Sequence, residues 1–300
     1  ELVQNGVDLR LGVSVKGFHE ENGALFADLS TGESVRCSLA VLAIGVKPET
    51  GLAKDADLAI GERGGIVVDE HMQTNDPAIY AVGDAVEVTD FVAGVKTAIP
   101  LAGPANRQGR IAADNIFGKK SVYRKTQGTA ICKVFGLAAG MTGLNEKSLK
   151  RAGIPFEKIH IHAASHAGYF PGAFPISLKI LFDPKNGKIL GAQAVGRDGV
   201  DKRIDVLAVA LRAGLTVFDL EDLELAYAPP YGSAKDPVNY AGFAASNVLR
   251  GDVKLFHAEN IAAIGKHQQL LDVRTAEEVK SGIIPGAINI PVDDLRARLG

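Results

Sequence analysis

The chain has 300 residues, of which 46% are hydrophobic and 23% are charged, a composition that suffices for ordinary globular cores. Its net charge of -2 argues against broad electrostatic binding to nucleic acid. No apolar run reaches the length of a transmembrane helix and the two cysteines form no CxxC pair, so we expect a cytoplasmic protein without membrane contacts or disulfides.

The first predicted elements form an antiparallel meander that leads into a buried strand. Strands are predicted at 11–18 and 24–30, with a tight Asn-Gly turn between them, and another strand is predicted at 34–44. Residues 39–44 are a continuous apolar run, which is typical of a strand that is covered on both faces.

The stretch 74–84 carries the most informative motif, Thr-Asn-Asp-Pro-Ala-Ile-Tyr-Ala-Val-Gly-Asp. It predicts a polar turn and a short apolar strand, after another short strand at 66–69. Ligands dock outside the carboxyl ends of strands in a parallel sheet, and Gly83 at that end would let a cofactor approach the backbone closely. The carboxylate of Asp84 can accept hydrogen bonds from a polyol hydroxyl. The motif therefore favours a flavin contact over an ordinary strand and turn.

A helix is predicted to follow the segment 99–103. Pro104 suits its first turn and Gly118 is a plausible stop. The helix N-terminus carries partial positive charge and would stabilise an anionic reduced flavin ring, although a capped surface helix remains the alternative.

The region 125–251 predicts a separate α+β unit. In chain order we expect a helix at 145–152 capped by Asn145, strands at 158–163, 177–182 and 188–195, and amphipathic helices at 200–213 and 237–250, the last capped by Asp236.

The cysteines and histidines of this chain do not indicate a reactive or metal site. Cys132 lies in an apolar, strand-like run and is interpreted as an inert buried thiol, as is Cys37. His160 and His162 lie on one face of a predicted strand without a carboxylate or cysteine partner, so together with His166 they do not indicate zinc.

The sequence changes character after a linker at 252–266. A strand is predicted at 269–274, and Thr275 with Glu278 forms a capping box for a short helix. The run Ile-Pro-Gly-Ala-Ile-Asn-Ile-Pro follows at 284–291.

Taken together, these motifs resemble the pyridine nucleotide-disulfide oxidoreductases, in particular the coenzyme A-disulfide reductase branch that is fused to a rhodanese domain. The stretch 74–84 is similar to the second flavin fingerprint of that family, whose aspartate holds the ribitol of FAD. The segment that ends at Gly45 resembles the one that closes the nicotinamide-binding domain, although Ile44 replaces the usual threonine. The run 269–291 resembles the opening of a rhodanese domain, but Ile283 stands where that family often has histidine.

The resemblance implies an α/β fold made of the tail of two Rossmann-like FAD- and NAD(P)-binding domains, then an α+β dimerisation domain, then the start of an α/β rhodanese domain. The implied bounds are 1–50 for the NAD(P)-binding part, 51–122 for the FAD-binding part, 123–252 for the dimerisation domain and 262–300 for the rhodanese-like part. No GxGxxG turn occurs, so we expect that turn before residue 1 and the rhodanese cysteine after Gly300.

The resemblance also implies roles for individual residues. FAD contacts are implied for Gly45, Thr74, Tyr80, Ala81, Gly83, Asp84, Pro100, Leu101, Ala102 and Gly103. The segments 166–172 and 225–239 place Tyr169 and Tyr227 as catalytic tyrosines, the second of them on a loop that crosses the dimer. A phenol can donate a hydrogen bond to a developing thiolate, although both residues can also be plain interface tyrosines.

Four further residues are expected to bind the substrate. Lys235 matches a position that contacts coenzyme A, and an ammonium suits a molecule with several phosphates. Asn106, Tyr231 and Phe243 complete the set. A solvated charge at Lys235 and simple core packing of Phe243 remain the alternatives.

The implied function is an FAD-dependent oxidoreductase that uses NADH or NADPH to reduce coenzyme A disulfide, coenzyme A persulfide or polysulfide as a homodimer. Electrons would pass through the flavin to a cysteine upstream of this chain, so we expect the chain by itself not to turn over. Two alternatives stay open. One is an NADH oxidase or peroxidase of the same fold, and the other is a non-catalytic dimerisation and sulfur-carrier binding module.

Overall fold

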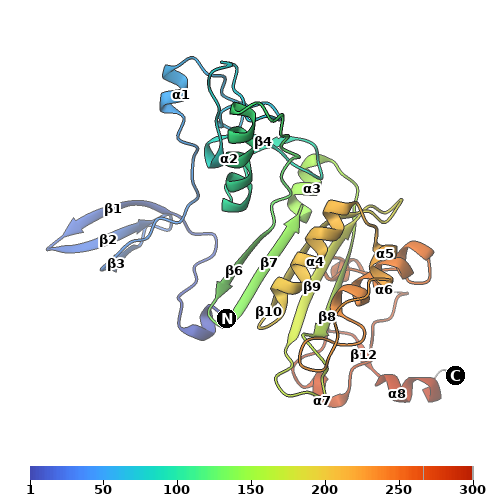
Figure 1. The fold of residues 1–300 in the computed structure, drawn as a ribbon. Helices are drawn as coiled ribbons and strands as arrows, with labels where there is room; N and C mark the ends of the chain where they lie inside the picture. Colours follow the sequence, from blue (N-terminus) through green and yellow to red (C-terminus); the bar gives the residue numbers. More distant parts are fainter. Residues whose placement is uncertain (266, 299–300) are drawn as a thin grey trace. The chain divides into compact units, whose positions relative to one another are not determined.

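The computed structural model describes residues 1–265 and 267–298 (Figure 1). They fall into two compact units, which divide after Arg250. In the part of the chain that is described, no helix has the length and apolarity that a membrane span requires.

The first unit begins with an antiparallel meander. Its strands are β1 (Val15–Glu21), β2 (Ala24–Leu29) and β3 (Ser34–Cys37), paired in that order after a short 3-10 helix η1 (Val3–Asn5). Asn22 and Gly23 both have positive φ, 50° and 74°, as a two-residue hairpin turn of the predicted kind requires. The meander is confirmed, but its first strand lies three to four residues later than predicted.

The buried strand predicted at 39–44 is wrong. No strand forms there, and Ile44 is 90% exposed while Leu39, Val41 and Leu42 are exposed as well. A strand of a parallel sheet needs a neighbour for its backbone groups, and none of the described residues pairs with this run. The apolar composition alone could not supply that neighbour.

The strands predicted before and inside the motif 74–84 are also not formed. Among the described residues, isolated bridges join Ile66 to Ile60 and to Val86, and Gln73 to Tyr80. The segment still packs around a small core of buried residues, which is made of Val68, Met72, Val86, Val88 and Ala112. Around it lie the short elements α1 (Gly51–Asp55), η2 (Gly83–Ala85), β4 (Val88–Thr89) and β5 (Lys96–Thr97).

The helix predicted after 99–103 is confirmed as α2 (Ala102–Ile116). Pro104 lies in its first turn, and Gly118 follows its end with a left-handed φ of 81°. Ala112 and the half-buried Ile111 turn toward the small core, so α2 packs against the segment that carries the motif.

A five-stranded antiparallel sheet forms the rest of the first unit. Its order is β6-β7-β10-β9-β8, from β6 (Ala130–Val134), β7 (Leu137–Gly143), β8 (Glu157–Ala164), β9 (Pro175–Phe182) and β10 (Ile189–Gly196). The helices are α3 (Glu146–Ala152), α4 (Val200–Ala213), α5 (Val217–Glu221) and α6 (Pro237–Arg250). The predicted α+β unit is therefore confirmed, including the Asn145 cap, which accepts a hydrogen bond from the Ser148 amide at 2.9 Å.

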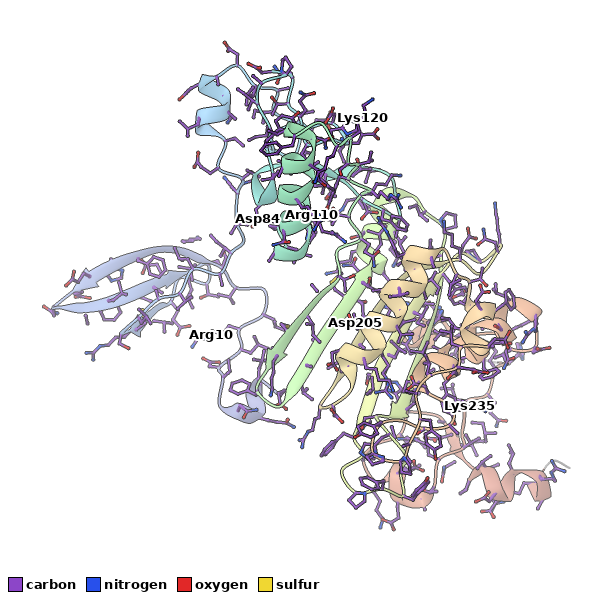
Figure 2. All side chains as sticks on the ribbon, viewed as in Figure 1. Arg10, Asp84, Arg110, Lys120, Asp205 and Lys235 are labelled. Atoms are coloured by element: carbon purple, nitrogen blue, oxygen red, sulfur yellow. The ribbon has the colours of Figure 1, made fainter. Side chains whose placement is uncertain are left out.

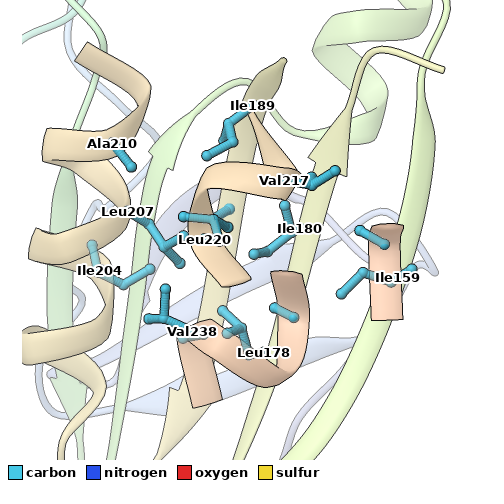
Figure 3. Close-up of a cluster of buried hydrophobic side chains, with 14 of the residues drawn as sticks. Ile159, Leu178, Ile180, Ile189, Ile204, Leu207, Ala210, Val217, Leu220 and Val238 are labelled. Atoms are coloured by element: carbon cyan, nitrogen blue, oxygen red, sulfur yellow. The ribbon is translucent and has the colours of Figure 1, made fainter. Parts of the chain in front are cut away.

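The core of this sheet lies between its strands and the helices α4, α5 and α6 (Figure 3). Leu178 and Ile180 of β9 meet Ile204 and Leu207 of α4, all at most 2% exposed. Strand β7 was missed because its sequence is rich in alanine and glycine. Gly140 is needed there, since a Cβ would meet Ile204 at 2.9 Å.

The interpretation of Cys132 as a buried thiol is wrong. It lies in β6, as its apolar neighbours predict, but β6 is an edge strand and the cysteine is exposed. Cys37, interpreted in the same way, is only half-buried in β3.

The second unit contains η3 (Ala258–Ala263), β11 (Leu271–Asp272), α7 (Ala276–Val279), β12 (Ile288–Asn289), α8 (Val292–Leu295) and η4 (Arg296–Arg298). Strands β11 and β12 pair in parallel. The predicted capping box is confirmed, with Thr275 and Glu278 each bonding the other's backbone amide. The predicted linker contains η3, and its last residue, Lys266, lies outside the described residues.

Candidate functional site

The Gly-Asp pair of the motif is attached to α2 by one hydrogen bond. The Gly83 amide donates to Oε1 of Gln108 at 2.7 Å, and Gln108 is only 1% exposed. Gly83 adopts a φ of 83°, a left-handed conformation that glycine takes without strain. This turn leaves the Asp84 side chain exposed beside α2 (Figure 2).

Asp84 lines a cavity of about 430 Å³. The other lining residues are Val46, Lys47, Pro48, Glu49, Ala85, Ala98 and Pro100. Within the described parts of the chain, no residue forms a hydrogen bond or ion pair with the Asp84 carboxylate. Both of its oxygens are therefore available to hydroxyl groups of a ligand.

The N-terminus of α2 is open in the same region. Its N-cap, Leu101, makes no side-chain hydrogen bond, and the first turn contains no acidic residue. Ala102 and Gly103 are exposed, so their amides can meet an electron-rich group. An unpaired carboxylate and an uncapped helix start fit the sugar-alcohol chain and the carbonyl edge of a flavin.

Three of the residues that the resemblance implies as FAD contacts have side chains that contact other parts of the protein instead. Oγ1 of Thr74 lies 3.1 Å from the Asp76 carbonyl and 3.0 Å from the Ile79 carbonyl, so it stabilises the turn. Tyr80 and Ala81 pack against the small core beside α2. None of these three lines the Asp84 cavity, and neither does Gly45, which is exposed immediately before Val46.

The structure brings the two predicted catalytic tyrosines together. The hydroxyl groups of Tyr169 and Tyr227 lie 3.0 Å apart, although 58 residues separate them in the sequence. The side chains are accessible, with Tyr169 76% and Tyr227 48% exposed. The hydrogen bond to Tyr227, with a smaller effect of burial, raises the pKa of Tyr169 above its usual value.

Lys235 is exposed, and its ammonium lies over two aromatic rings. Its ammonium is 5.2 Å from the ring centroids of both Tyr240 and Phe243. It also lines a cavity of about 360 Å³ together with His162 and His166. Phe243 thus packs against Lys235 in this chain, a contact that the sequence did not predict.

The other two expected substrate residues stand apart from these cavities. Tyr231 is 73% exposed, and Asn106 is exposed on the second turn of α2. Neither lines the cavity of Asp84 or that of Lys235. Throughout residues 1–265 and 267–298, no group of three histidines, cysteines or carboxylates is arranged to hold a metal ion.

Sequence reasoning missed Arg203, the largest fully buried side chain of the described residues. It pairs with Asp236, which was predicted only as a helix cap. A signal was present, because Arg203 lies one helical turn before Leu207, which the pattern places on the apolar side of a predicted amphipathic helix. An arginine there needs a buried partner.

Comparison with known families assigns most of the chain. Residues 1–109 match the family described as pyridine nucleotide-disulphide oxidoreductase, and residues 129–237 match the dimerisation domain of the same family. Residues 257–299 match the rhodanese-like domain.

Individual relatives agree with this assignment. A coenzyme A disulfide reductase of Staphylococcus haemolyticus is 34% identical over 206 residues, 68% of this chain and 46% of that protein. The reduced CoADR-RHD of Bacillus anthracis superposes with a TM-score of 0.95 at 53% identity, covering 99% of this chain and 54% of that one. An NAD-dependent persulfide reductase from A. fulgidus gives 0.92 at 38% identity, with coverage of 99% and 54%. The chain thus spans about half the length of the relatives it matches.

Proposed function

Because the chain belongs to the pyridine nucleotide-disulphide oxidoreductase family and carries a rhodanese-like segment, we propose that it serves an FAD-dependent reductase of coenzyme A disulfide or coenzyme A persulfide. NADH or NADPH is the proposed electron donor. The observation that supports this most directly is the pair of tyrosine hydroxyls at 3.0 Å, since two accessible phenols suit the cleavage of a sulfur–sulfur bond.

Asp84 and the start of α2 are the proposed flavin contacts of this chain. The Asp84 carboxylate would accept hydrogen bonds from the ribitol, and the amides of Ala102 and Gly103 would face the pyrimidine edge of the ring. A flavin held there supplies the transfer of two electrons from a nicotinamide to sulfur. Gln108 keeps the Gly83 turn in place, so that Asp84 stays directed at the cavity.

The tyrosine pair is proposed to assist the leaving sulfur. When a disulfide breaks, one sulfur leaves as a thiolate, and a phenol that donates a hydrogen bond to it lowers the cost of its charge. Tyr169 is suited to this because its side chain is 76% exposed and its hydroxyl lies beside that of Tyr227, so that one phenol of the pair can donate to sulfur while it accepts from the other. Lys235 would attract the phosphates of a coenzyme A substrate.

The cysteine that would receive electrons from the flavin is not assigned to this chain. Neither Cys37 nor Cys132 lines the cavity of Asp84 or that of Lys235. We propose that both serve the fold only. In a homodimer, which the match of residues 129–237 to a dimerisation domain favours, each tyrosine pair would act at the flavin of the other subunit.

The proposal is tested on the protein purified with its flavin. NADH or NADPH oxidation is followed with coenzyme A disulfide, with coenzyme A persulfide, and with oxygen as the sole acceptor, and free coenzyme A, sulfide and water are quantified. Acceptor-dependent release of coenzyme A or sulfide supports the proposal. Water as the only product would identify an NADH oxidase, and a colourless, inactive protein would identify the binding module.

A further inference from the structure

A buried ion pair lies between the two loops that carry the tyrosines. The Tyr169 loop is 165–174, and the Tyr227 loop is 222–236. Arg203 and Asp236 are 1% and 2% exposed. Nη2 of Arg203 donates to Oδ2 of Asp236 at 2.8 Å, and Nε donates to Oδ1 at 3.2 Å. A two-pronged pair of this kind fixes the direction of both side chains as well as their distance.

Arg203 holds the base of the Tyr169 loop. Its Nη2 also donates to the Ser165 carbonyl at 2.7 Å. Ser165 closes that loop, because its amide donates to the Phe174 carbonyl at 2.8 Å and its hydroxyl accepts from the Phe174 amide at 3.2 Å. Tyr169 lies between these two residues, so the guanidinium determines where its loop begins.

Lys202 and Asp236 hold the Tyr227 loop. Nζ of Lys202 donates to the carbonyls of Ala226 and Tyr231 at 3.3 and 3.4 Å, and it lies 3.8 Å from Oδ2 of Asp236. Asp236 in turn accepts from the Val238 amide at 3.1 Å and so begins α6. The lysine therefore contacts the backbone directly before Tyr227 and beyond it.

The two loops are also joined directly, and the local backbone makes room for the arginine. The Ala167 amide donates to the Gly232 carbonyl at 2.9 Å. Nη1 of Arg203 donates to the Gly199 carbonyl at 3.2 Å. A Cβ on Gly199 would lie 2.2 Å from Nη1, and the φ of 70° there also favours glycine. The absence of a side chain at Gly199 thus leaves the space that the Arg203 guanidinium occupies.

We propose that Arg203, Lys202 and Asp236 are positioning residues that hold Tyr169 and Tyr227 within hydrogen-bonding distance. A buried ion pair contributes little net stability, because desolvation offsets the attraction, whereas it can specify one arrangement. The effect of these residues on catalysis rests on the proposed function, whereas their effect on the position of the two tyrosine hydroxyl groups does not. Because Arg203 is fully buried, the main variants change Lys202, whose side chain is 32% exposed.

The first test measures the NMR signals of the tyrosines and does not depend on enzyme activity. Lys202→Met and Lys202→Arg are prepared with tyrosine labelled at the ring ζ carbon, and the six tyrosine signals are recorded by NMR at neutral pH. Tyr227→Phe defines the Tyr169 signal without its partner. We expect Lys202→Met to move the Tyr169 signal toward that position and Lys202→Arg to restore it. Lys147→Met, an exposed change on α3, is the control and should leave the signal in place.

The second test measures turnover of the holoenzyme. With coenzyme A disulfide we expect Lys202→Met to lower kcat by roughly 3- to 30-fold with little change in KM, and Lys202→Arg to recover most of the loss. If the wild type lacks reductase activity while the Tyr169 signal still moves, the proposed function fails and the positioning role stands. If folded Lys202→Met and Arg203→Lys both leave the Tyr169 signal unchanged, the positioning role is overturned.

Discussion

The side-chain oxygen of Gln108, inside α2, accepts the amide hydrogen of Gly83 at 2.7 Å. This bond joins the helix whose first turn is open to a ligand to the turn that presents Asp84. Replacing Gln108 by leucine keeps the volume but leaves the Gly83 amide without its acceptor. We expect the free energy of unfolding to fall by about 1–3 kcal/mol, as measured by urea denaturation. Arg110→Leu, an exposed change on the same helix, should cost much less.

Asp84→Ala separates flavin binding from stability. The carboxylate is exposed, so the free energy of unfolding of the flavin-free protein should stay within about 0.5 kcal/mol of the wild type. Flavin affinity should fall by roughly 10- to 100-fold, because a hydrogen bond to a charged group contributes about 1.5–3 kcal/mol. Flavin fluorescence titration measures this. Asp205→Ala, an exposed aspartate on α4, is the matched control, and an equal loss in both variants would contradict the assignment.

Tyr227→Phe removes one hydroxyl of the tyrosine pair. The hydrogen bond raises the pKa of Tyr169, so without it Tyr169 should ionise at lower pH, near the ordinary value of about 10. A tyrosine whose pKa is raised in the folded state stabilises the fold at pH values below its ordinary pKa. That contribution is lost as the pH rises through the raised pKa. Alkaline titration of tyrosinate absorbance checks the shift. Tyr231→Phe should leave Tyr169 unchanged, since Tyr231 does not bond to it.

Glu146 should make the fold sensitive to acid. Burial raises its pKa, but hydrogen bonds from Lys179 and Lys158 overcome this and lower it from 4.5 to about 2. A carboxylate whose pKa is lowered in the folded state stabilises the fold above pH 4.5. This contribution is lost as the pH falls toward about 2.

The matching variant is Glu146→Gln. We expect it to unfold more easily at pH 7, by roughly 1–3 kcal/mol, and to show a smaller further loss than the wild type between pH 5 and pH 2. Denaturant unfolding at several pH values measures both. Glu62→Gln, at an exposed position, should reproduce the wild-type curve, and a parallel fall for Glu146→Gln would contradict the role of the carboxylate.

Local signals predicted much of the fold. Helix α4 was predicted because its apolar side chains recur at helical spacing and Gly214 ends it with a left-handed φ of 76°. Helix α3 was predicted because Asn145 can cap it and Gly153 can end it. These signals lie within a few residues of the element that they define, and so a single sequence contains them.

The parts that failed depend on residues far away in the sequence. The run 39–44 has the composition of a buried strand, but the composition does not supply the strand that would pair with it. Tyr169 and Tyr227 were both expected from the family resemblance, yet their hydroxyl contact depends on two loops meeting. Arg203 was missed because its partner, Asp236, lies 33 positions later in the chain.

The exposed run 39–44 has a consequence for laboratory work with this chain. Leu39, Val41, Leu42 and Ile44 present closely spaced aliphatic side chains to water, which favours self-association at the concentrations that crystallisation and NMR require. A single Leu42→Lys exchange should raise the solubility limit in a precipitation assay without altering the melting temperature, whereas Lys47→Leu should lower that limit.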